Sequence, residues 1–194
     1  MKIVILGGTF DPIHLGHVAL AQRAKEQFHL NKIFFIPAGI PPHKQAHENV
    51  TPAPHRFRMV ELAIEGISDF KVLPIETKRA GISYTVDTLD AFKKIYPDDE
   101  LYLILGADSL AEIPTWREPE RIQQLAKMIV VPRRASKTAA YPENVLKIDM
   151  PICDLSSSEI REKIRQGKSV HGMLTPRVEE YILHHKLYSK SGTH

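Results

Sequence analysis

Two histidines, His14 and His17, stand three residues apart, shortly after a pair of glycines, Gly7 and Gly8, that end an apolar run. Residues three apart share one face of a helix, so the two imidazoles would lie one turn apart. Imidazole N–H groups can bind phosphate oxygens and, when protonated, stabilise charge on a leaving group. The pattern therefore indicates phosphate chemistry. A zinc site would use the same residue type, but the His-Glu-x-x-His spacing and a third ligand are missing.

The glycines would let the backbone approach a phosphate closely, and the helix that follows offers unpaired amides and a positive dipole end. In open α/β sheets ligands bind outside the carboxyl ends of the strands, where Gly7, Gly8, Thr9 and Phe10 are expected to lie. Phe10 is also expected to pack against the core. The turn lacks the G-x-G-x-x-G fingerprint, which disfavours a dehydrogenase.

A second group of polar residues lies in DLSSSEIREKI (154–164). Ser156 and Glu159 have the spacing of a capping box at the start of a helix. Ser157 and Arg161 are four apart and would share a helix face, which would place a hydroxyl, free amides and a guanidinium around one anion. That arrangement suits the β- and γ-phosphates of a nucleotide. Helix capping alone remains the alternative explanation.

Short β-branched runs alternate with segments of helical period, which predicts a doubly wound parallel α/β sheet with a helical C-terminal cap, in one domain spanning 1–194. The expected strands are 2–6, 32–37, 70–75, 101–106, 127–132 and, more weakly, 145–150. The expected helices are 15–29, 54–67, 84–96, a broken one across 107–125, and two after residue 150, at 156–167 and 175–188. The stretch 37–54 is too long for an ordinary connection and is expected to be a functional or a disordered loop.

The composition limits the class of protein. The chain has 194 residues, 43% of them hydrophobic, and a formal net charge of +3, which without an aromatic and basic stripe predicts no nucleic-acid partner. The single cysteine, Cys153, suits a reducing compartment. No apolar stretch reaches the roughly 18 residues of a membrane span, and the first residues lack the apolar region of a signal peptide. A cytoplasmic protein with no membrane partner is therefore expected.

The segments GGTFDPIHLGH (7–17) and LSSSEIR (155–161) resemble the nucleotidyltransferase superfamily, whose members carry (T/S)-F-D-x-x-H-x-G-H and I-S-S-T-x-(I/V)-R motifs. Leu155 and Ser158 depart mildly from the second motif, since apolar bulk and a hydroxyl are kept. Within the superfamily the chain is similar to the bacterial nicotinate-nucleotide adenylyltransferases. The segments that carry this similarity are PPHK (41–44), SYTVDTL (83–89), GADSL (106–110), Trp116 and VPR (131–133).

The resemblance implies an enzyme that joins the adenylyl group of ATP to the phosphate of nicotinate mononucleotide, giving deamido-NAD and pyrophosphate. The substrate phosphate is already an anion, so no activated nucleophile is needed, and catalysis would be positioning plus charge stabilisation. Mg²⁺ would bridge the triphosphate with few protein ligands, and no residue is assigned to hold it. The oligomeric state stays open, a homodimer included.

The site expected from the motifs and the resemblance has two parts. Catalytic roles fall to His14, His17, Lys44 and Arg161, with His17 nearer the transferring group. Besides these histidines and Arg161, ATP would contact Gly7, Gly8, Thr9, Phe10, Gly106, Asp108, Arg133, Ser156 and Ser157. The mononucleotide would contact Gly8, Thr9, Lys44, Thr85, Asp108 and Trp116.

Several of these residues have simpler explanations. Lys44 would otherwise be a solvated loop lysine, Asp108 an N-cap, and Trp116 a packing residue. Thr85 is expected as the N-cap of the helix that begins there, which would bring unpaired amides to a nicotinate carboxylate. The main alternative function is a regulatory module that keeps the fold and senses ATP or NAD. Pyrophosphate release would distinguish the two.

Overall fold

The computed structural model describes residues 1–39, 50–131, 145–151 and 155–189. Its centre is a six-stranded sheet, in the order β3-β2-β1-β4-β5-β6, in which every neighbouring pair is parallel. The strands are β1 (Lys2–Gly8), β2 (Lys32–Pro37), β3 (Phe70–Val72), β4 (Glu100–Gly106), β5 (Lys127–Val131) and β6 (Val145–Lys147). The predicted doubly wound parallel α/β fold is confirmed.

The strands are apolar on both faces because both faces are covered by helices. In β1, Ile3 and Ile5 pack into one cluster while Val4 and Leu6 pack into the other, and all four are at most 4% exposed. The first cluster is completed by α3 (Thr85–Ile95) and α5 (Pro119–Leu125). The second is completed by α1 (Leu15–Phe28) and α2 (Ala53–Ile64), on the opposite face.

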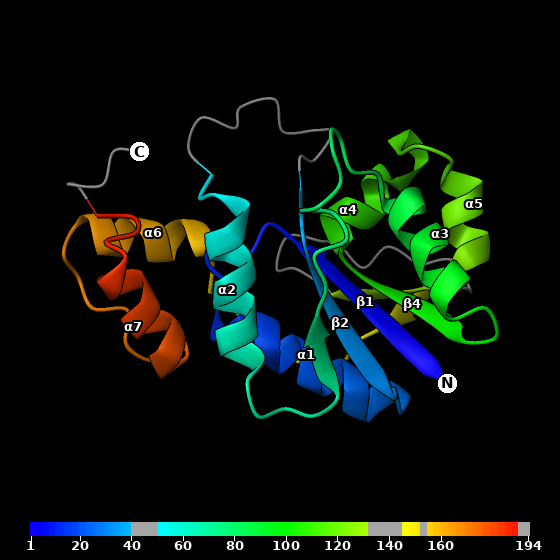
Figure 1. Cartoon of the computed structure of the whole chain (residues 1–194). Coiled ribbons are helices and arrows are strands. Elements are labelled where there is room, and N and C mark those ends of the chain that lie inside the picture. The colour runs from blue at the N-terminus through cyan, green and yellow to red at the C-terminus, as the bar shows by residue number, and fades with distance from the viewer. Residues whose placement is uncertain (40–49, 132–144, 152–154, 190–194) are drawn as a thin grey trace.

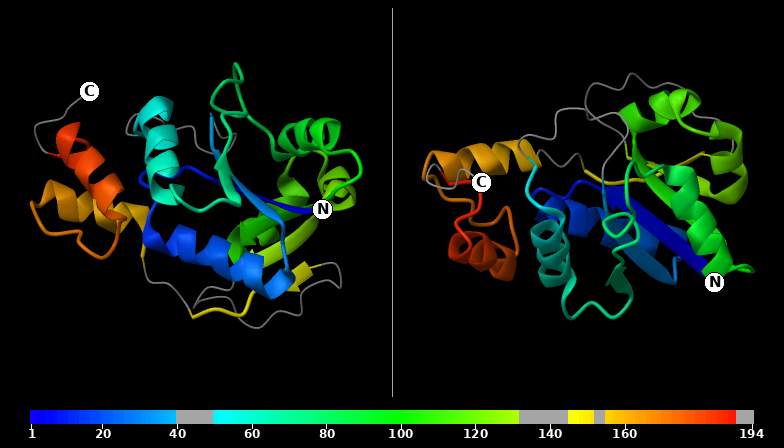
Figure 2. Two further views of the ribbon diagram at one scale, coloured as in Figure 1. Left: turned by 60° about the horizontal axis from the view of Figure 1, so that its bottom comes forward. Right: turned by 45° about the horizontal axis from the view of Figure 1, so that its top comes forward.

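The predicted C-terminal cap is also confirmed. Two helices, α6 (Ser157–Arg165) and α7 (Pro176–His184), add Ile160, Val178 and Ile182 to the cluster on the α1 and α2 side. They lie beside α2, at the end of the molecule away from α3 and α5 (Figures 1 and 2). The C-terminal part of the chain thereby reaches the residues that follow β1.

The element boundaries differ from the sequence prediction where proline or a left-handed residue interrupts the chain. The strand expected over 70–75 ends at Val72, because Pro74 cannot donate to the sheet. The broken helix over 107–125 becomes α4 (Ala107–Glu112), the 3₁₀ turn η1 (Ile113–Thr115) and α5. Glu118, with φ +52°, and Pro119 separate the last two. Trp116 lies in this break, close to the carboxyl ends of β1 and β4.

The strand order sets the position of the site. From β1 the chain runs outward to β2 and β3 and then returns to β4 on the other side of β1. The carboxyl ends of β1 and β4 therefore flank the point where the order reverses, the usual ligand position in such sheets. No helix within the described ranges is long and apolar enough to cross a membrane.

Candidate active site

The turn after β1 is tight and closely packed. A Cβ added at Gly8 would lie 3.0 Å from the ring of Phe10, so a larger residue would displace that ring. Phe10 adopts φ +50° and is 2% exposed, which confirms its expected packing role. The Asp11–Pro12 peptide bond is cis. Contact of this turn with a nucleotide remains a prediction.

The two histidines lie together at the start of α1, with His14 as the N-cap residue. Their ring centroids are 3.7 Å apart, and the His17 ring meets the Phe10 ring edge-on at 5.1 Å. The backbone N–H of His14 donates to Nδ1 of His17 at 3.2 Å. Because Nδ1 accepts, the neutral His17 ring carries its proton on Nε2, as a donor that suits a phosphate oxygen.

Both histidines are neutral near pH 7. Burial lowers the pKa of His14 to about 4, and burial together with repulsion by His14 lowers the pKa of His17 to about 3. The cause is that removal from water disfavours the charged imidazole. The neutral rings can offer N–H donors to phosphate oxygens without first taking up a proton. Nδ1 of His14 is buried and has no hydrogen-bond partner within the described residues.

Helix α6 brings the second motif against the first. Ser157 Oγ donates to the carbonyl of Pro12 at 2.9 Å, across 145 residues of sequence, and Arg161 Nη1 donates to the carbonyl of Asp11 at 2.7 Å. Ser156 Oγ accepts from the N–H of Glu159 at 3.2 Å, as the capping explanation expects. Ser157 and Arg161 therefore hold the backbone of the turn between β1 and α1 (residues 9–14), which we call the histidine turn. The sequence did not indicate this arrangement.

Gly106 is the last residue of β4 and Asp108 follows it, at the same carboxyl end of the sheet. The N-cap of α4 is Gly106, so the alternative N-cap explanation for Asp108 is wrong. Asp108 is exposed in the first turn of α4, and its predicted ribose contact remains a prediction. Lys44 and Arg133 lie outside the described residues.

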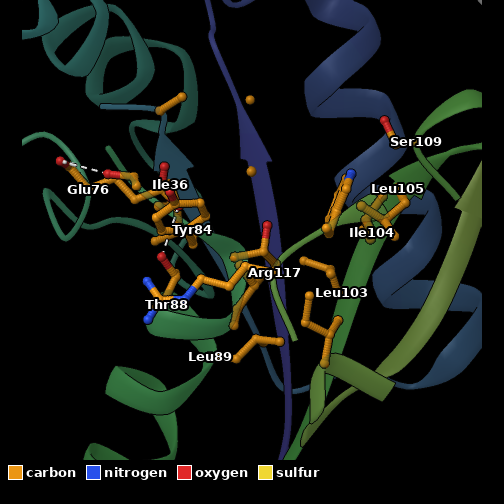
Figure 3. Close-up of a pocket in the computed structure, with 18 of the residues that line it drawn as sticks. Ile36, Glu76, Tyr84, Thr88, Leu89, Leu103, Ile104, Leu105, Ser109 and Arg117 are labelled. Carbon is orange, nitrogen blue, oxygen red and sulfur yellow. Dashed lines mark hydrogen bonds between the residues drawn. The ribbon is translucent and has the colours of Figure 1, made fainter. Parts of the chain in front are cut away.

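A cavity of about 520 Å³ opens beside the turn. It brings together five residues expected to contact ligand, which are Gly7, Gly8, Thr9, Thr85 and Trp116. In Figure 3 Glu76, Tyr84 and Thr88 lie on one side of it and Leu105 and Ser109 on the other, with Arg117 between them. The rest of its lining is largely aliphatic and comes from Ile5, Ile36, Leu89, Leu103, Ile104 and Ile122. Such a cavity suits a flat ring with a few polar substituents.

The polar groups of the cavity include those around the start of α3 and the turn after η1. Thr85 is the first residue of α3 and Tyr84 its N-cap, so the expected N-cap role of Thr85 is wrong by one position. The unpaired amides of that helix start still lie at the cavity. The Arg117 guanidinium lies 4.9 Å from the centroid of the Tyr84 ring. Nε1 of Trp116 is buried and, within the described residues, has no hydrogen-bond partner.

One half-buried carboxylate in the cavity wall, Glu76, was not predicted from the sequence. Thr88 Oγ1 donates to Glu76 Oε1 at 2.9 Å, and a hydrogen bond from the Gly39 backbone also reaches this side chain. Burial raises the pKa of Glu76, while these two bonds oppose the rise. A Cβ at Gly39 would lie 2.5 Å from the Glu76 carbonyl oxygen, so only glycine fits there. A lone glutamate in a short connection gives no signal in sequence.

Comparison with known proteins identifies the family. Residues 5–163 match the cytidylyltransferase-like family model. A Dictyoglomus thermophilum protein, named "Probable nicotinate-nucleotide adenylyltransferase", is 41% identical over 97% of this chain and 100% of its own length. A Thermus thermophilus protein of the same name is 40% identical, also over 97% of this chain and 100% of its own length. The chain belongs to the nicotinate-nucleotide adenylyltransferase family of cytidylyltransferase-like proteins.

Solved structures agree with this family in fold. The Plasmodium falciparum nicotinic acid mononucleotide adenylyltransferase complexed with NaAD superposes with a TM-score of 0.80 at 22% identity, covering 96% of this chain and 97% of that one. The same enzyme complexed with APC gives a TM-score of 0.76 at 23% identity, covering 96% of each chain. At these identities the likeness shows that this member of the adenylyltransferase family shares their fold.

Proposed function

We propose that this chain transfers the adenylyl group of ATP to the phosphate of nicotinate mononucleotide, giving deamido-NAD and pyrophosphate. One observation carries the proposal: Gly7, Gly8 and Thr9, which lead into the turn that α6 holds, line a cavity sized for a flat ring. Phosphates at the turn and a pyridine ring in the cavity would belong to two substrates that meet at Gly8 and Thr9. Relatives about 40% identical over nearly the whole chain carry the name of this activity.

The reaction needs no activated side-chain nucleophile. A phosphate oxygen of the mononucleotide attacks the α-phosphorus of ATP, and a new P–O–P bridge forms. The bond between the α-phosphorus and the oxygen that joins it to the β-phosphorus breaks. Pyrophosphate leaves with that electron pair. The protein has to align the two anions and stabilise the charge that develops on the oxygens. Nε2–H of His17 is the donor best suited to this task, since its neighbour's N–H fixes its tautomer.

Further cations complete the phosphate site in this proposal. Lys44 and Arg133 would add charge at the triphosphate, and Asp108 would contact a ribose. Within the described part of the chain no group of three or more His, Cys, Asp or Glu could hold a metal ion. In this proposal a Mg²⁺ would arrive with ATP and would supply charge neutralisation at the triphosphate.

The cavity predicts a preference for nicotinate over nicotinamide mononucleotide. The helix start at Thr85 offers backbone donors, and the Arg117 guanidinium lies beside it, 3.9 Å from Asp87 and 3.6 Å from Glu118. A carboxylate only accepts hydrogen bonds, whereas a carboxamide would set its own NH₂ against these donors. An unpaired buried donor costs about 1–3 kcal/mol, so kcat/KM should favour the acid by roughly tenfold to a hundredfold.

A panel of substrates tests the proposal by pyrophosphate release. The protein is incubated with ATP and, in turn, nicotinate mononucleotide, nicotinamide mononucleotide and phosphopantetheine, and with CTP in place of ATP. The greatest kcat/KM is expected for ATP with nicotinate mononucleotide. Equal or greater values for nicotinamide mononucleotide would overturn the acid preference. No pyrophosphate with any combination would favour the nucleotide-sensing module.

Three coarser expectations accompany this function. We expect one domain over 1–194 and a reaction in the cytoplasm. We expect the binding partners to be ATP and the mononucleotide, and neither a nucleic acid nor a membrane. A homodimer is proposed as the assembly to test. Sedimentation of the whole chain would measure it.

A further inference from the structure

Two buried charged residues lie at the histidine turn, Asp11 within the turn and Arg56 on α2, and each residue is only 3% exposed. Asp11 Oδ1 accepts from the hydroxyl of Tyr188 at 2.6 Å, across 177 residues of sequence. Asp11 Oδ2 accepts from the backbone N–H of Thr51 at 3.3 Å. The C-terminal segment therefore reaches the turn through the Tyr188 hydroxyl.

Arg56 completes the network from α2. Its Nη1 donates to the carbonyl of Thr9 and its Nε to the carbonyl of Thr51, both at 2.8 Å. Its charge also offsets that of Asp11, which would otherwise repel an anion bound at the turn. Each of these bonds ends on the turn itself or on Thr51, just before α2.

Together with α6, the network fixes three parts of the turn backbone. The carbonyl of Thr9 is held by Arg56, that of Asp11 by Arg161 and that of Pro12 by Ser157. In a trans peptide the N–H of the next residue points opposite to the carbonyl. Holding the Thr9 and Pro12 carbonyls therefore also fixes the directions of the Phe10 and Ile13 N–H groups. Donors fixed before binding lose little freedom when an anion arrives.

Folding stability alone gives little reason for this arrangement. Two opposite charges buried close together are often no more stabilising than apolar side chains of the same volume. Tyr188 also adopts φ +64°, an uncommon backbone conformation for a residue with a bulky side chain. Burial and the Asp11 carboxylate raise the pKa of Tyr188, so its hydroxyl remains a donor. Tyr188, in this uncommon conformation, and the buried Arg56 both make hydrogen bonds to the histidine turn.

We propose that Tyr188 is a positioning residue. Through its hydrogen bond to Asp11, and together with Arg56, it holds the histidine turn in the geometry that binds phosphate. The proposal rests on the phosphate role that the proposed function gives to this turn. It assigns Tyr188 no contact with substrate. Loss of its hydroxyl should therefore weaken ATP binding and turnover, and should leave recognition of the pyridine ring unchanged.

The test compares Tyr188→Phe with Tyr181→Phe in the full-length chain. Tyr181 is a matched control, because its hydroxyl also lies in a hydrogen bond, 2.8 Å from Nδ1 of His55, and within the described residues it makes no hydrogen bond to the turn. Tyr188→Phe should raise the Kd for Mg-ATP about fivefold to tenfold and lower kcat to a similar extent, with KM for the mononucleotide within about threefold of the parent. Tyr181→Phe should leave all three within about twofold, whatever either variant loses in thermal stability.

Arg56→Lys provides a second variant that keeps the charge but cannot hold the Thr9 and Thr51 carbonyls with one planar group. It should weaken Mg-ATP binding in the same way, and it carries the test if Tyr188→Phe does not fold. Unchanged Mg-ATP affinity in Tyr188→Phe, or an equal loss in Tyr181→Phe, would overturn the proposal. Direct measurement of Mg-ATP binding separates this result from the proposed function, which fails if the parent protein releases no pyrophosphate from ATP with nicotinate mononucleotide.

Discussion

The two sides of the candidate site are built in opposite ways. Around the histidine turn, side chains from α2, α6 and the C-terminal segment make hydrogen bonds to the turn, and the charged side chains of Asp11 and Arg56 are buried. Across the site, the cavity lined by Trp116 and Tyr84 has a largely aliphatic wall with a few polar atoms. Fixed N–H donors suit phosphate oxygens, whereas a shaped apolar cavity suits a ring.

The difference implies a division of work between the two sides. Substitutions at the turn should act on ATP and on the rate of transfer, because developing charge is stabilised there. Substitutions in the cavity should act on the affinity for the mononucleotide, because the ring is held there in both the ground state and the transition state. Each kinetic variant below should fall on one side of this division.

The largest effect is expected for His17→Ala. Loss of the Nε2–H donor should lower kcat by ~10²–10³, with a smaller change in the Kd for ATP, because the donor acts mainly on charge that develops during transfer. Steady-state kinetics and ATP titration would measure both. His184→Ala, at an exposed histidine on α7, is the control. A His17→Ala enzyme within a few-fold of the parent rate would exclude this role.

Trp116→Ala should act in the cavity, on the affinity for the mononucleotide. Removing the ring face should raise KM for nicotinate and nicotinamide mononucleotide alike, by about tenfold or more, since a buried aromatic side chain contributes a few kcal/mol of contact. The Kd for ATP should stay within about threefold. The ratio of kcat/KM between acid and amide should also survive, because the helix start at Thr85 and not the ring face discriminates between them. A collapse of that ratio would reassign the discrimination to Trp116.

The smallest effect concerns acid stability. In the unfolded chain a histidine titrates near pH 6.5, whereas in the folded protein the pKa is about 4 for His14 and about 3 for His17. Between these values the unfolded chain binds more protons, so stability falls as the pH drops below about 6.5. His14→Gln should therefore lose about 1–2 kcal/mol less than the parent between pH 7 and pH 5.

Urea unfolding at both pH values would measure this difference. His171→Gln is the matched control, since the His171 side chain is 87% exposed. Parallel losses in the parent and in His14→Gln would show that the His14 ring is not buried in a neutral form.

The sequence predicted most of the fold because local pattern determines it. The apolar runs predicted as strands over 2–6 and 101–106 became the two central strands, β1 and β4, and the two helices after residue 150 formed as expected. The boundaries moved by a residue or a few where backbone geometry decides, as at Tyr84, which caps α3 in place of Thr85. Such shifts depend on the conformation of one residue, which periodicity does not report.

Side-chain partners could not be predicted in the same way. The spacing of Ser157 and Arg161 placed both on one face of a helix, but their carbonyl partners lie at the other end of the chain. The Asp11–Tyr188 bond spans 177 residues and leaves no local pattern. In the sequence Arg56 has the pattern of an ordinary exposed arginine on a helix, whereas the folded protein buries it. Contacts of this kind follow from topology rather than from spacing.

A crystal structure of this protein with deamido-NAD bound would test the division of the site most directly. We expect the pyrophosphate group within hydrogen-bond distance of the turn and of Nε2 of His17. We expect the pyridine ring in the cavity against Trp116, with its carboxylate at the amides that begin α3. A pyridine ring bound outside that cavity, or an adenine ring within it, would contradict the division.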